Sequence, residues 1–254
     1  MDSHRDLILD QFTRQAVPFA NAAPIRNQEA LDRIVRMADA GGADTALDVA
    51  CGPGLLVCAF ARVVRHATGI DLTPAMIERA REEQQAQSLE NVSWRQGDAL
   101  QLPYPDSHFS IVSSRFVFHH LLHPQAALAE MIRVCEPGGR IVVADSAPEG
   151  PKADAFNAME RLRDPSHVRA FTLDELHAMF IELGLPEPRV DAYRLDGDLD
   201  GLLQRSFPNP GDEDRIRQIF ARALDDDAID MAPHLRDGKI HYAFPVAILS
   251  ATVR

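Results

Sequence analysis

The stretch that decides the fold is residues 46–54, ALDVACGPG, in which a glycine-rich turn ends a short apolar run. A segment of helical length, LLVCAFARVV at 55–64, follows directly. A strand that stops at glycines and continues into a helix places bare backbone beside a ligand, at the carboxyl edge of a parallel sheet. Because glycines also form ordinary tight turns, this G-x-G alone predicts either a ligand site or a turn.

A regular alternation of strands and helices continues from residue 46 to residue 145. Helices are predicted at 55–64 and after Pro74 and Pro124, with Thr73 as a cap, and strands at 46–50, 67–70, 91–96, 109–114 and 140–145. This pattern predicts an α/β fold, a Rossmann-like doubly wound sheet that is mostly parallel and has helices on both faces.

After Asp145 the alternation is less regular. A capping box at Thr172 opens one further helix, Gly184 closes it, and a strand is predicted at 188–195. The final segment, 242–254, is predicted to be an antiparallel last strand, at an edge or a bulge because it contains Pro245.

Three segments are predicted to form a helical flap and cap within a single domain. Residues 1–30 have a weak amphipathic pattern, broken by Pro18 and Pro24 into one or two short helices. Segments 148–170 and 198–240 contain helix breakers and mixed polarity, and we expect no separate core in them. Such segments near the carboxyl edge of an open sheet cover its crevice.

The composition indicates a globular protein with an acidic surface. Lys and Arg number 26 and Asp and Glu 38, so the formal net charge of the 254 residues is −12. This charge repels nucleic acid and anionic lipid, and no apolar run approaches the ~20 residues of a membrane span. Three cysteines without a C-x-x-C and an N-terminus without a signal-peptide pattern predict a reducing compartment. We therefore expect a cytoplasmic protein without nucleic-acid or membrane partners, and a homodimer stays open.

Two acidic residues follow the next two predicted strands. Asp71 ends the strand at 67–70, where a carboxylate either accepts hydrogen bonds from a ribose diol or caps the following helix. Asp98, within Gly97-Asp98-Ala99, accepts from an adenine amine or forms an ordinary turn. Since the ends of successive parallel strands share one crevice, we predict that the three turns form one site.

Taken together, these motifs resemble the class I S-adenosylmethionine-dependent methyltransferases, especially the small-molecule group of the ubiquinone/menaquinone-type enzymes. LDVACGPG, GIDLTPAMIERAR, QGDALQLPYPDSHFSIVSSRFVFHHL and EPGGRIVVAD stand in that family's order within residues 46–145. The resemblance implies a cofactor-binding core there, with S-adenosyl-L-methionine as cofactor and S-adenosyl-L-homocysteine as product. It also implies a small-molecule acceptor, in secondary metabolism or quinone biosynthesis.

The resemblance assigns a role to each matching position. Asp71 would hold the ribose hydroxyls and Asp98 the adenine amine, while Gly52 and Gly54 would lie against the methionine part. Two positions depart from the family pattern: Ser110 stands where an acidic residue is frequent, and Arg115 where Asn is. The full predicted cofactor set is Phe19, Ala50, Gly52, Gly54, Asp71, Leu72, Met76, Gly97, Asp98, Ala99, Arg115 and His120.

Methyl transfer needs mainly alignment and exclusion of water, because a sulfonium methyl is already electrophilic. A weakly nucleophilic acceptor also needs a general base, for which His119 and His167 are the candidates. The alternatives are a packed histidine for His119 and a solvated loop residue for His167. Phe19, His167 and Phe171 are expected to face the acceptor. We expect the flap and the cap to determine which acceptor is bound.

Two other functions compete with methyl transfer as explanations of these motifs. A nicotinamide-dependent oxidoreductase is disfavoured because Val57 stands where the dinucleotide fingerprint has Gly or Ala. A non-methylating protein that binds S-adenosylmethionine stays open, since no base is obligatory. No metal is predicted, because the fourth strand ends in Ser113-Ser114-Arg115 rather than in carboxylates.

Overall fold

The computed structural model describes residues 3–254, which form one eight-stranded sheet. Its strands are β1 (Thr45–Val49), β2 (His66–Asp71), β3 (Val92–Gln96), β4 (Phe109–Arg115), β5 (Cys135–Ser146), β6 (Arg189–Asp198), β7 (His234–Arg236) and β8 (Lys239–Thr252). The order is β3-β2-β1-β4-β5-β8-β6, with β7 paired to β8. Strands β1 to β5 are parallel, and β8 is antiparallel to β5 and β6. The predicted mostly parallel sheet with an antiparallel last strand is confirmed.

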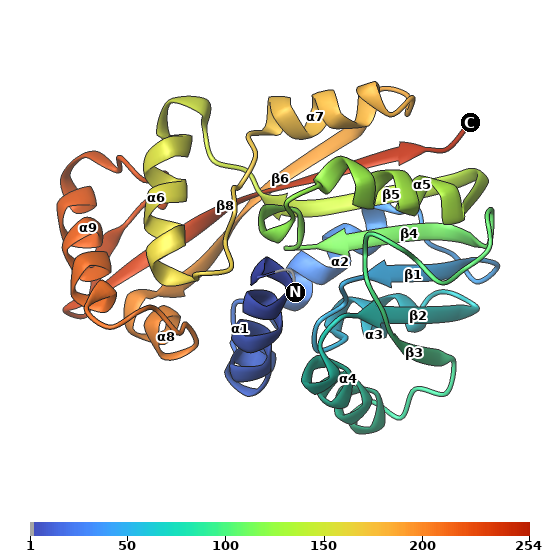
Figure 1. Ribbon diagram of the computed structural model, residues 1–254, viewed down its shortest axis with the longest axis horizontal. Coiled ribbons are helices and arrows are strands. Elements are labelled where there is room, and N and C mark those ends of the chain that lie inside the picture. The colour runs from blue at the N-terminus through green and yellow to red at the C-terminus, as the bar shows by residue number, and fades with distance from the viewer. Residues whose placement is uncertain (1–2) are drawn as a thin grey trace.

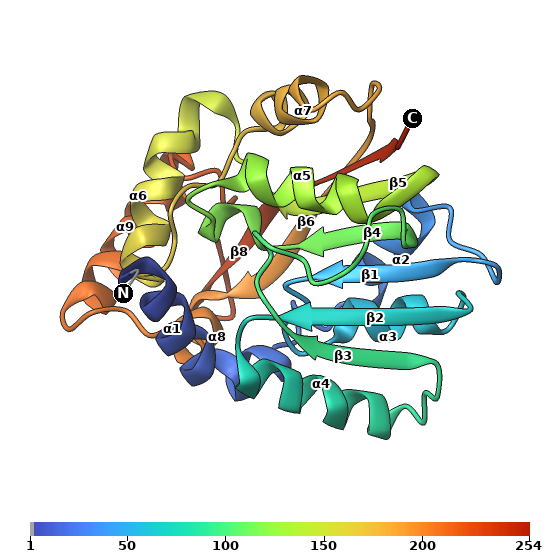
Figure 2. The ribbon, with the colours of Figure 1, turned by 45° about the vertical axis from the view of Figure 1, so that its right-hand side comes forward.

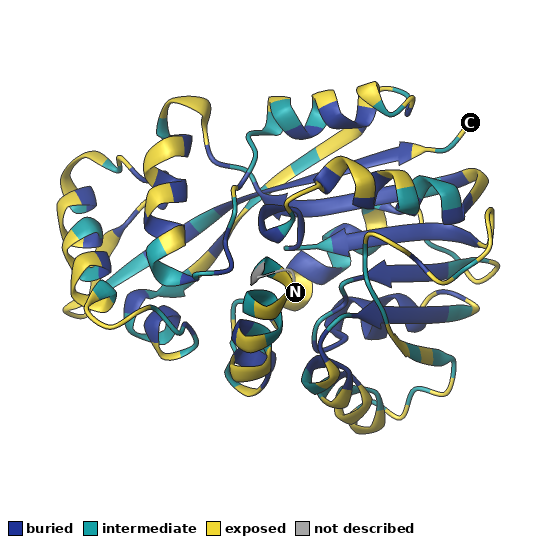
Figure 3. Ribbon diagram, viewed as in Figure 1, coloured by how far each residue is buried: buried dark blue, intermediate teal, exposed yellow. Residues whose placement is uncertain are grey.

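Helices cover both faces of this sheet (Figures 1 and 2). On one face lie α2 (Gln28–Met37), α3 (Leu55–Ala61) and α4 (Pro74–Ala86), and on the other α5 (Pro124–Val134) and α7 (Leu173–Glu182). Neighbouring residues of β4 point to opposite faces of the sheet. Ile111 packs with α2, α3 and α4, and Val112 packs with α5 and α7. Figure 3 shows the central strands buried along their length.

The amino-terminal helix α1 (Ser3–Ala20) lies across the end of the sheet toward which β1 to β4 point (Figure 2). The predicted break at Pro18 does not occur, because this proline falls in the last turn and the helix ends at Ala20. Contacts at both of its sides hold the helix: Arg5 pairs with Asp98 after β3, and Gln15 Nε2 donates to Asp164 Oδ2 at 2.9 Å.

The cap forms a separate lobe beyond the long ends of β6 and β8 (Figure 1). It contains α6 (Ala153–Arg163), α8 (Leu199–Gln204) and α9 (Asp212–Asp226), with short 3-10 turns at Gly150–Lys152 and, nearer the sheet, at Phe118–His120. The expectation that the cap adds no core is wrong. Its helices share an apolar cluster with β8, made of Phe156, Met159, Leu199, Leu202, Ile216, Phe220, Met231, Tyr242 and neighbours.

The last strand differs from the prediction in one respect. β8 is an inner strand, paired on both sides, rather than an edge. Pairing with β5 stops at Ser146 opposite Val246, and Ala147 N donates to Pro245 O at 3.0 Å. Pro245, which has no amide hydrogen, therefore lies where β5 leaves the sheet. At this position β8 has no ladder partner on the β5 side, so it is a local edge. The capping box of α7 forms as predicted, between Thr172 and Glu175.

Candidate active site

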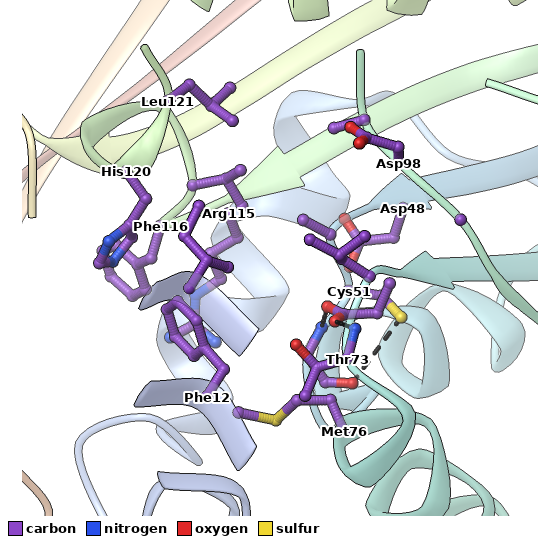
Figure 4. Close-up of a pocket in the computed structure, with 18 of the residues that line it drawn as sticks. Phe12, Asp48, Cys51, Thr73, Met76, Asp98, Arg115, Phe116, His120 and Leu121 are labelled. Carbon is purple, nitrogen blue, oxygen red and sulfur yellow. Dashed lines mark hydrogen bonds between the residues drawn. The ribbon is translucent and has the colours of Figure 1, made fainter. Parts of the chain in front are cut away.

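Strands β1 to β4 end at one pocket, which α1 covers and which we call the strand-end pocket. It holds about 1340 Å³ of empty space, open mouth included. In Figure 4, Phe12 and His120 lie on one side of it and Asp48 and Asp98 on the other. The predicted cofactor residues that line it are Phe19, Ala50, Gly52, Asp71, Leu72, Met76, Gly97, Asp98, Ala99, Arg115 and His120.

The turn after β1 presents backbone to this pocket. Ala50 and Gly52 have φ of 54° and 52°. Apart from Gly52 and its two chain neighbours, no residue of 3–254 has an atom within 4 Å of where a Gly52 Cβ would stand. Gly54 has a different role from the predicted one. A Cβ on Gly54 would lie 2.5 Å from Trp94 Cη2, so this glycine lets α3 pack under Trp94 instead of lining the pocket.

Asp71 has one of the two roles that the sequence left open, because its carboxylate holds the backbone at the start of α4. Its Oδ1 accepts from Thr73 N and its Oδ2 from Gly52 N, both at 2.8 Å. The carboxylate of Asp71, rather than the predicted Thr73 hydroxyl, thus caps α4. Burial raises the pKa of Asp71, against the effect of these N–H donors. A carboxylate has about four lone-pair sites, so sites remain for a ligand in the pocket that Asp71 lines.

Asp98 forms the turn that the sequence allowed and also contacts α1. Its Oδ1 accepts from Leu100 N at 2.9 Å, and its Oδ2 forms an ion pair with Arg5. The Asp98 side chain is 32% exposed and the Arg5 side chain 48%. The pair therefore fastens the first turns of α1 to the pocket by a contact that water can reach.

Arg115, the last residue of β4, also lines the strand-end pocket. Its Nη1 donates to Ile25 O at 3.1 Å, whereas its Nε and Nη2 are buried without a partner in the described chain. Nearby Asp48 has a pKa raised to about 7 by burial, against the hydrogen bond of Ser113 and the charge of Arg115. A buried donor without an acceptor is costly, so Arg115 fits a ligand that carries an acceptor such as a carboxylate.

A second cavity, the cap pocket, adjoins the first and holds about 670 Å³ of empty space, open mouth included. Phe12, Phe19, Ile25, Phe116 and His120 line both pockets and so form the wall between them. The remaining lining comes from α1 and the loop after it, from the sheet end and from the cap: Gln15, Pro24, His119, Ser146, Glu160, Arg163, Asp164, Leu195, Leu202, Arg205 and Phe244.

His119 is held at the cap pocket by Asp145. Its Nδ1 lies 2.5 Å from Asp145 Oδ1, and the Asp145 oxygens also accept backbone N–H groups of Val117, Phe118 and Ser146. Asp145 acts here as an acceptor, so the shared hydrogen belongs to Nδ1 and Nε2 is left as a base. Burial lowers the pKa of His119, but the charge and hydrogen bond of Asp145 prevail and raise it overall.

Two further histidines pack beside His119. The ring centroids of His119 and His120 are 4.2 Å apart, and burial together with His119 lowers the pKa of His120 to about 3. His167 is only 4% exposed rather than solvated, and its Nε2 donates to Asn157 Oδ1 at 2.7 Å. Residues 3–254 contain no cluster of His, Cys, Asp and Glu that could hold a metal.

Two residues expected to face the acceptor are placed elsewhere. His167 lies behind His119, at 5.4 Å between ring centroids, and Phe171 packs on the sheet core under the Arg169 guanidinium. Neither belongs to the described lining of the strand-end pocket or the cap pocket, whereas Phe19 belongs to both. The sequence interpretation also omitted Asp48 and Asp145, although each stands in or just after a predicted strand.

Comparisons with known proteins agree with this geometry. The methyltransferase domain model matches residues 47–143. The uncharacterized methyltransferase YcgJ of Bacillus subtilis is 33% identical, over 86% of this chain and 87% of its own. Its crystal structure superposes with a TM-score of 0.81 at 31% identity, covering 90% of this chain and 99% of that one.

Two other relatives match over shorter stretches. The 27-O-demethylrifamycin SV methyltransferase of Amycolatopsis mediterranei is 33% identical, over 63% of this chain and 61% of its own. A ubiquinone/menaquinone biosynthesis C-methyltransferase of Ruegeria is 37% identical, over 39% of this chain and 41% of its own. Within residues 3–254, the helices are all too short or too polar to cross a membrane.

Proposed function

Because this chain belongs to the class I S-adenosylmethionine-dependent methyltransferases, with a methyltransferase relative 33% identical over 87% of that protein's length, we propose that it methylates a small molecule bound in the cap pocket. The observation that carries the proposal is the pair of adjoining cavities, which share a wall of mainly aromatic residues. One cavity has the polar groups that a nucleoside needs, and the other has a histidine base.

In this proposal the cofactor occupies the strand-end pocket. Asp71 accepts hydrogen bonds from the ribose, and Asp98 accepts from the adenine amine. The backbone at Gly52, which is open to the pocket, lies along the methionine part. The buried Nε and Nη2 of Arg115 pair with the carboxylate of that methionine, which supplies the acceptor they lack.

When bound, the cofactor supplies an electrophilic methyl group on a sulfonium. The protein excludes water with α1 and positions the acceptor. His119 Nε2 accepts the proton of an acceptor hydroxyl, and Asp145 orients the ring and stabilises the imidazolium that forms. The imidazolium is favoured by the same carboxylate that raises the pKa of His119.

The names of the relatives suggest the range of acceptors. One is a rifamycin methyltransferase and another a quinone-biosynthesis C-methyltransferase. We therefore place the acceptor of this chain among the small molecules of secondary metabolism or quinone biosynthesis. The net charge of −12 also favours a small molecule over a nucleic acid.

The test follows a labelled methyl group. The protein is incubated with methyl-labelled S-adenosylmethionine and with fractions of low-molecular-mass metabolites. Label should enter a small molecule, with S-adenosylhomocysteine formed in equal amount. If the cofactor binds but no fraction yields S-adenosylhomocysteine, the chain is the non-methylating binding protein; label in nucleic acid or protein would refute the acceptor class.

A further inference from the structure

The cap pocket has an apolar body. Its wall includes Phe12, Phe19 and Phe116 on the side shared with the strand-end pocket, and Leu195, Leu202 and Phe244 on the cap side. Ligand sites for small molecules are typically lined by apolar and aromatic side chains with a few polar groups among them. Such a lining fits a compact ligand that is largely aromatic or hydrocarbon.

Most charges on this wall are already compensated by neighbouring groups. Arg163 forms two hydrogen bonds with Glu160, at 2.8 and 2.6 Å. Asp164 accepts from Gln15 Nε2 at 2.9 Å and from Ser166 N and Oγ at 2.9 and 2.6 Å. These groups therefore need no partner from a ligand.

Arg205 is different. Its Nη2 donates to the phenol oxygen of buried Tyr242 at 2.6 Å, which anchors the guanidinium by a neutral group. Within the part of the chain that the structure describes, no carboxylate lies within 4.0 Å of it. A half-buried cation on an apolar wall gains most from an anion that arrives with the ligand, because charge-assisted pairs strengthen where water is excluded.

His119 and Arg205 line the same cavity, His119 from the turn after β4 and Arg205 from the position that follows α8. Resting on the proposed function, we propose that the acceptor is a small, largely apolar acid: its carboxylate pairs with Arg205 while its reacting hydroxyl lies at His119. Arg205 is then a specificity-determining residue that selects a hydroxy acid over its neutral ester. The hydroxyl proton passes to His119 Nε2, and the oxygen forms a bond to the methyl carbon while the bond from that carbon to the sulfonium sulfur breaks. The electron pair of the broken bond stays on sulfur, so S-adenosylhomocysteine leaves as a neutral thioether and the carboxylate is unchanged.

The first test measures binding to the protein saturated with S-adenosylhomocysteine. Three hydroxy acids of increasing length serve as probes in calorimetry: 4-hydroxybenzoate, 4-hydroxycinnamate and 4′-hydroxybiphenyl-4-carboxylate, each beside its methyl ester. We expect at least one acid to bind tenfold or more tightly than its ester. Arg205→Met should abolish that preference, and Arg205→Lys should retain part of it.

Two controls keep this outcome interpretable. Arg217→Met removes an arginine that already pairs with Asp200 and Glu213 on the cap surface, and should preserve the preference. Affinity for S-adenosylhomocysteine, measured in the same preparations, reports whether each variant folds. Equal binding of acids and esters, absence of binding by every acid, or a preference that survives Arg205→Met would each overturn the inference.

A second measurement separates this inference from the proposed function. The methyl-labelled product formed from metabolite fractions should be retained by an anion exchanger at neutral pH, because its carboxylate is intact. A labelled product that is neutral would overturn the acid proposal and leave the methyltransferase proposal standing. Absence of any labelled product would refute the proposed function itself.

Discussion

Arg5, near the start of α1, forms an ion pair with Asp98 at the end of β3, across 93 positions of the chain. Asp98 is also the residue proposed to accept the adenine amine. On that proposal, one carboxylate both fastens the covering helix and binds the cofactor. Opening of α1 and binding of the nucleoside are therefore expected to be linked.

The first prediction concerns this competition. Exposed ion pairs contribute about 0–1 kcal/mol, so Arg5→Met should tighten S-adenosylhomocysteine binding by up to about fivefold. Calorimetry on the variant and on Arg14→Met measures the effect; the control loses the exposed pair with Asp10 on the same helix and a contact with Phe207, neither of which lies at the strand-end pocket. Weaker binding by Arg5→Met would mean that Arg5 contacts the cofactor instead of competing with it.

The second prediction separates the two roles of Asp71. Loss of a charge-assisted acceptor costs about 1.5–3 kcal/mol, so Asp71→Ala should weaken cofactor binding by that amount. Asp44 is the matched control, since it also accepts backbone and side-chain donors but lies at the other end of β1. Asp44→Ala should lower the melting temperature without changing the dissociation constant. Unchanged affinity in a folded Asp71→Ala protein would leave Asp71 as a helix cap alone.

The sheet could be predicted from sequence because its signals are local. Strand ends at Asp71 and Arg115, the Pro74 helix start and the Thr172 capping box each depend on a few neighbouring residues. Asp98 was found in the same way, from its place after a strand. Asp145 likewise stands at the end of a predicted strand, so the same argument also predicts it as a site residue.

The remaining features depend on tertiary contacts. Gly54 looks like a pocket glycine in the motif, but Trp94, 40 positions later, occupies the space above it. His167 follows a proline in a polar segment, yet Asn157 and the neighbouring histidines enclose it. Arg205 becomes informative only when α8 packs beside Tyr242. Sequence periodicity contains none of these relationships.

The third prediction is the pH dependence of catalysis. His119 must be neutral to accept a proton, and Asp145 raises its pKa above the ordinary 6.5. With a hydroxyl acceptor, kcat/KM should rise with pH through that raised value and then level off. His119→Gln should remove this rise and lower kcat by about 10²–10⁴-fold, while His66→Gln, at the amino end of β2, should keep the wild-type profile. An unchanged profile in His119→Gln would exclude the base role.

The fourth prediction concerns stability in acid. The pKa values of His120 and His167 are lowered by burial, so below about pH 6.5 the unfolded chain binds protons that the native chain does not. The stability that these two neutral histidines contribute is therefore present above pH 6.5 and lost as the pH falls. The free energy of unfolding decreases by about 1.4 kcal/mol per pH unit for each histidine. The pKa of His119 is raised, so its effect on stability has the opposite sign. Its contribution to the free energy of unfolding is present below pH 6.5 and is lost as the pH rises through the raised pKa.

Urea unfolding of wild type and His167→Gln at pH 7.5, 6.0 and 5.0 tests the fourth prediction. Comparison between the two proteins removes the effects of other groups that titrate in this range, such as Asp48. The free energy of unfolding of the variant should fall less steeply below pH 6.5 than that of wild type. Parallel curves would show that His167 is protonated in the native protein.

The last prediction divides acceptor from cofactor contacts among three phenylalanines. Phe244 lines only the cap pocket, Phe19 lines both pockets, and Phe171 packs on the sheet core away from the described linings. Removing a buried aromatic contact costs about 1.5–3 kcal/mol, so Phe244→Ala should raise the acceptor KM about tenfold or more and keep cofactor affinity within about threefold. Phe19→Ala should weaken both, and Phe171→Ala should change neither while lowering the melting temperature. An acceptor KM that responds to Phe171→Ala but not to Phe244→Ala would place the acceptor outside the cap pocket.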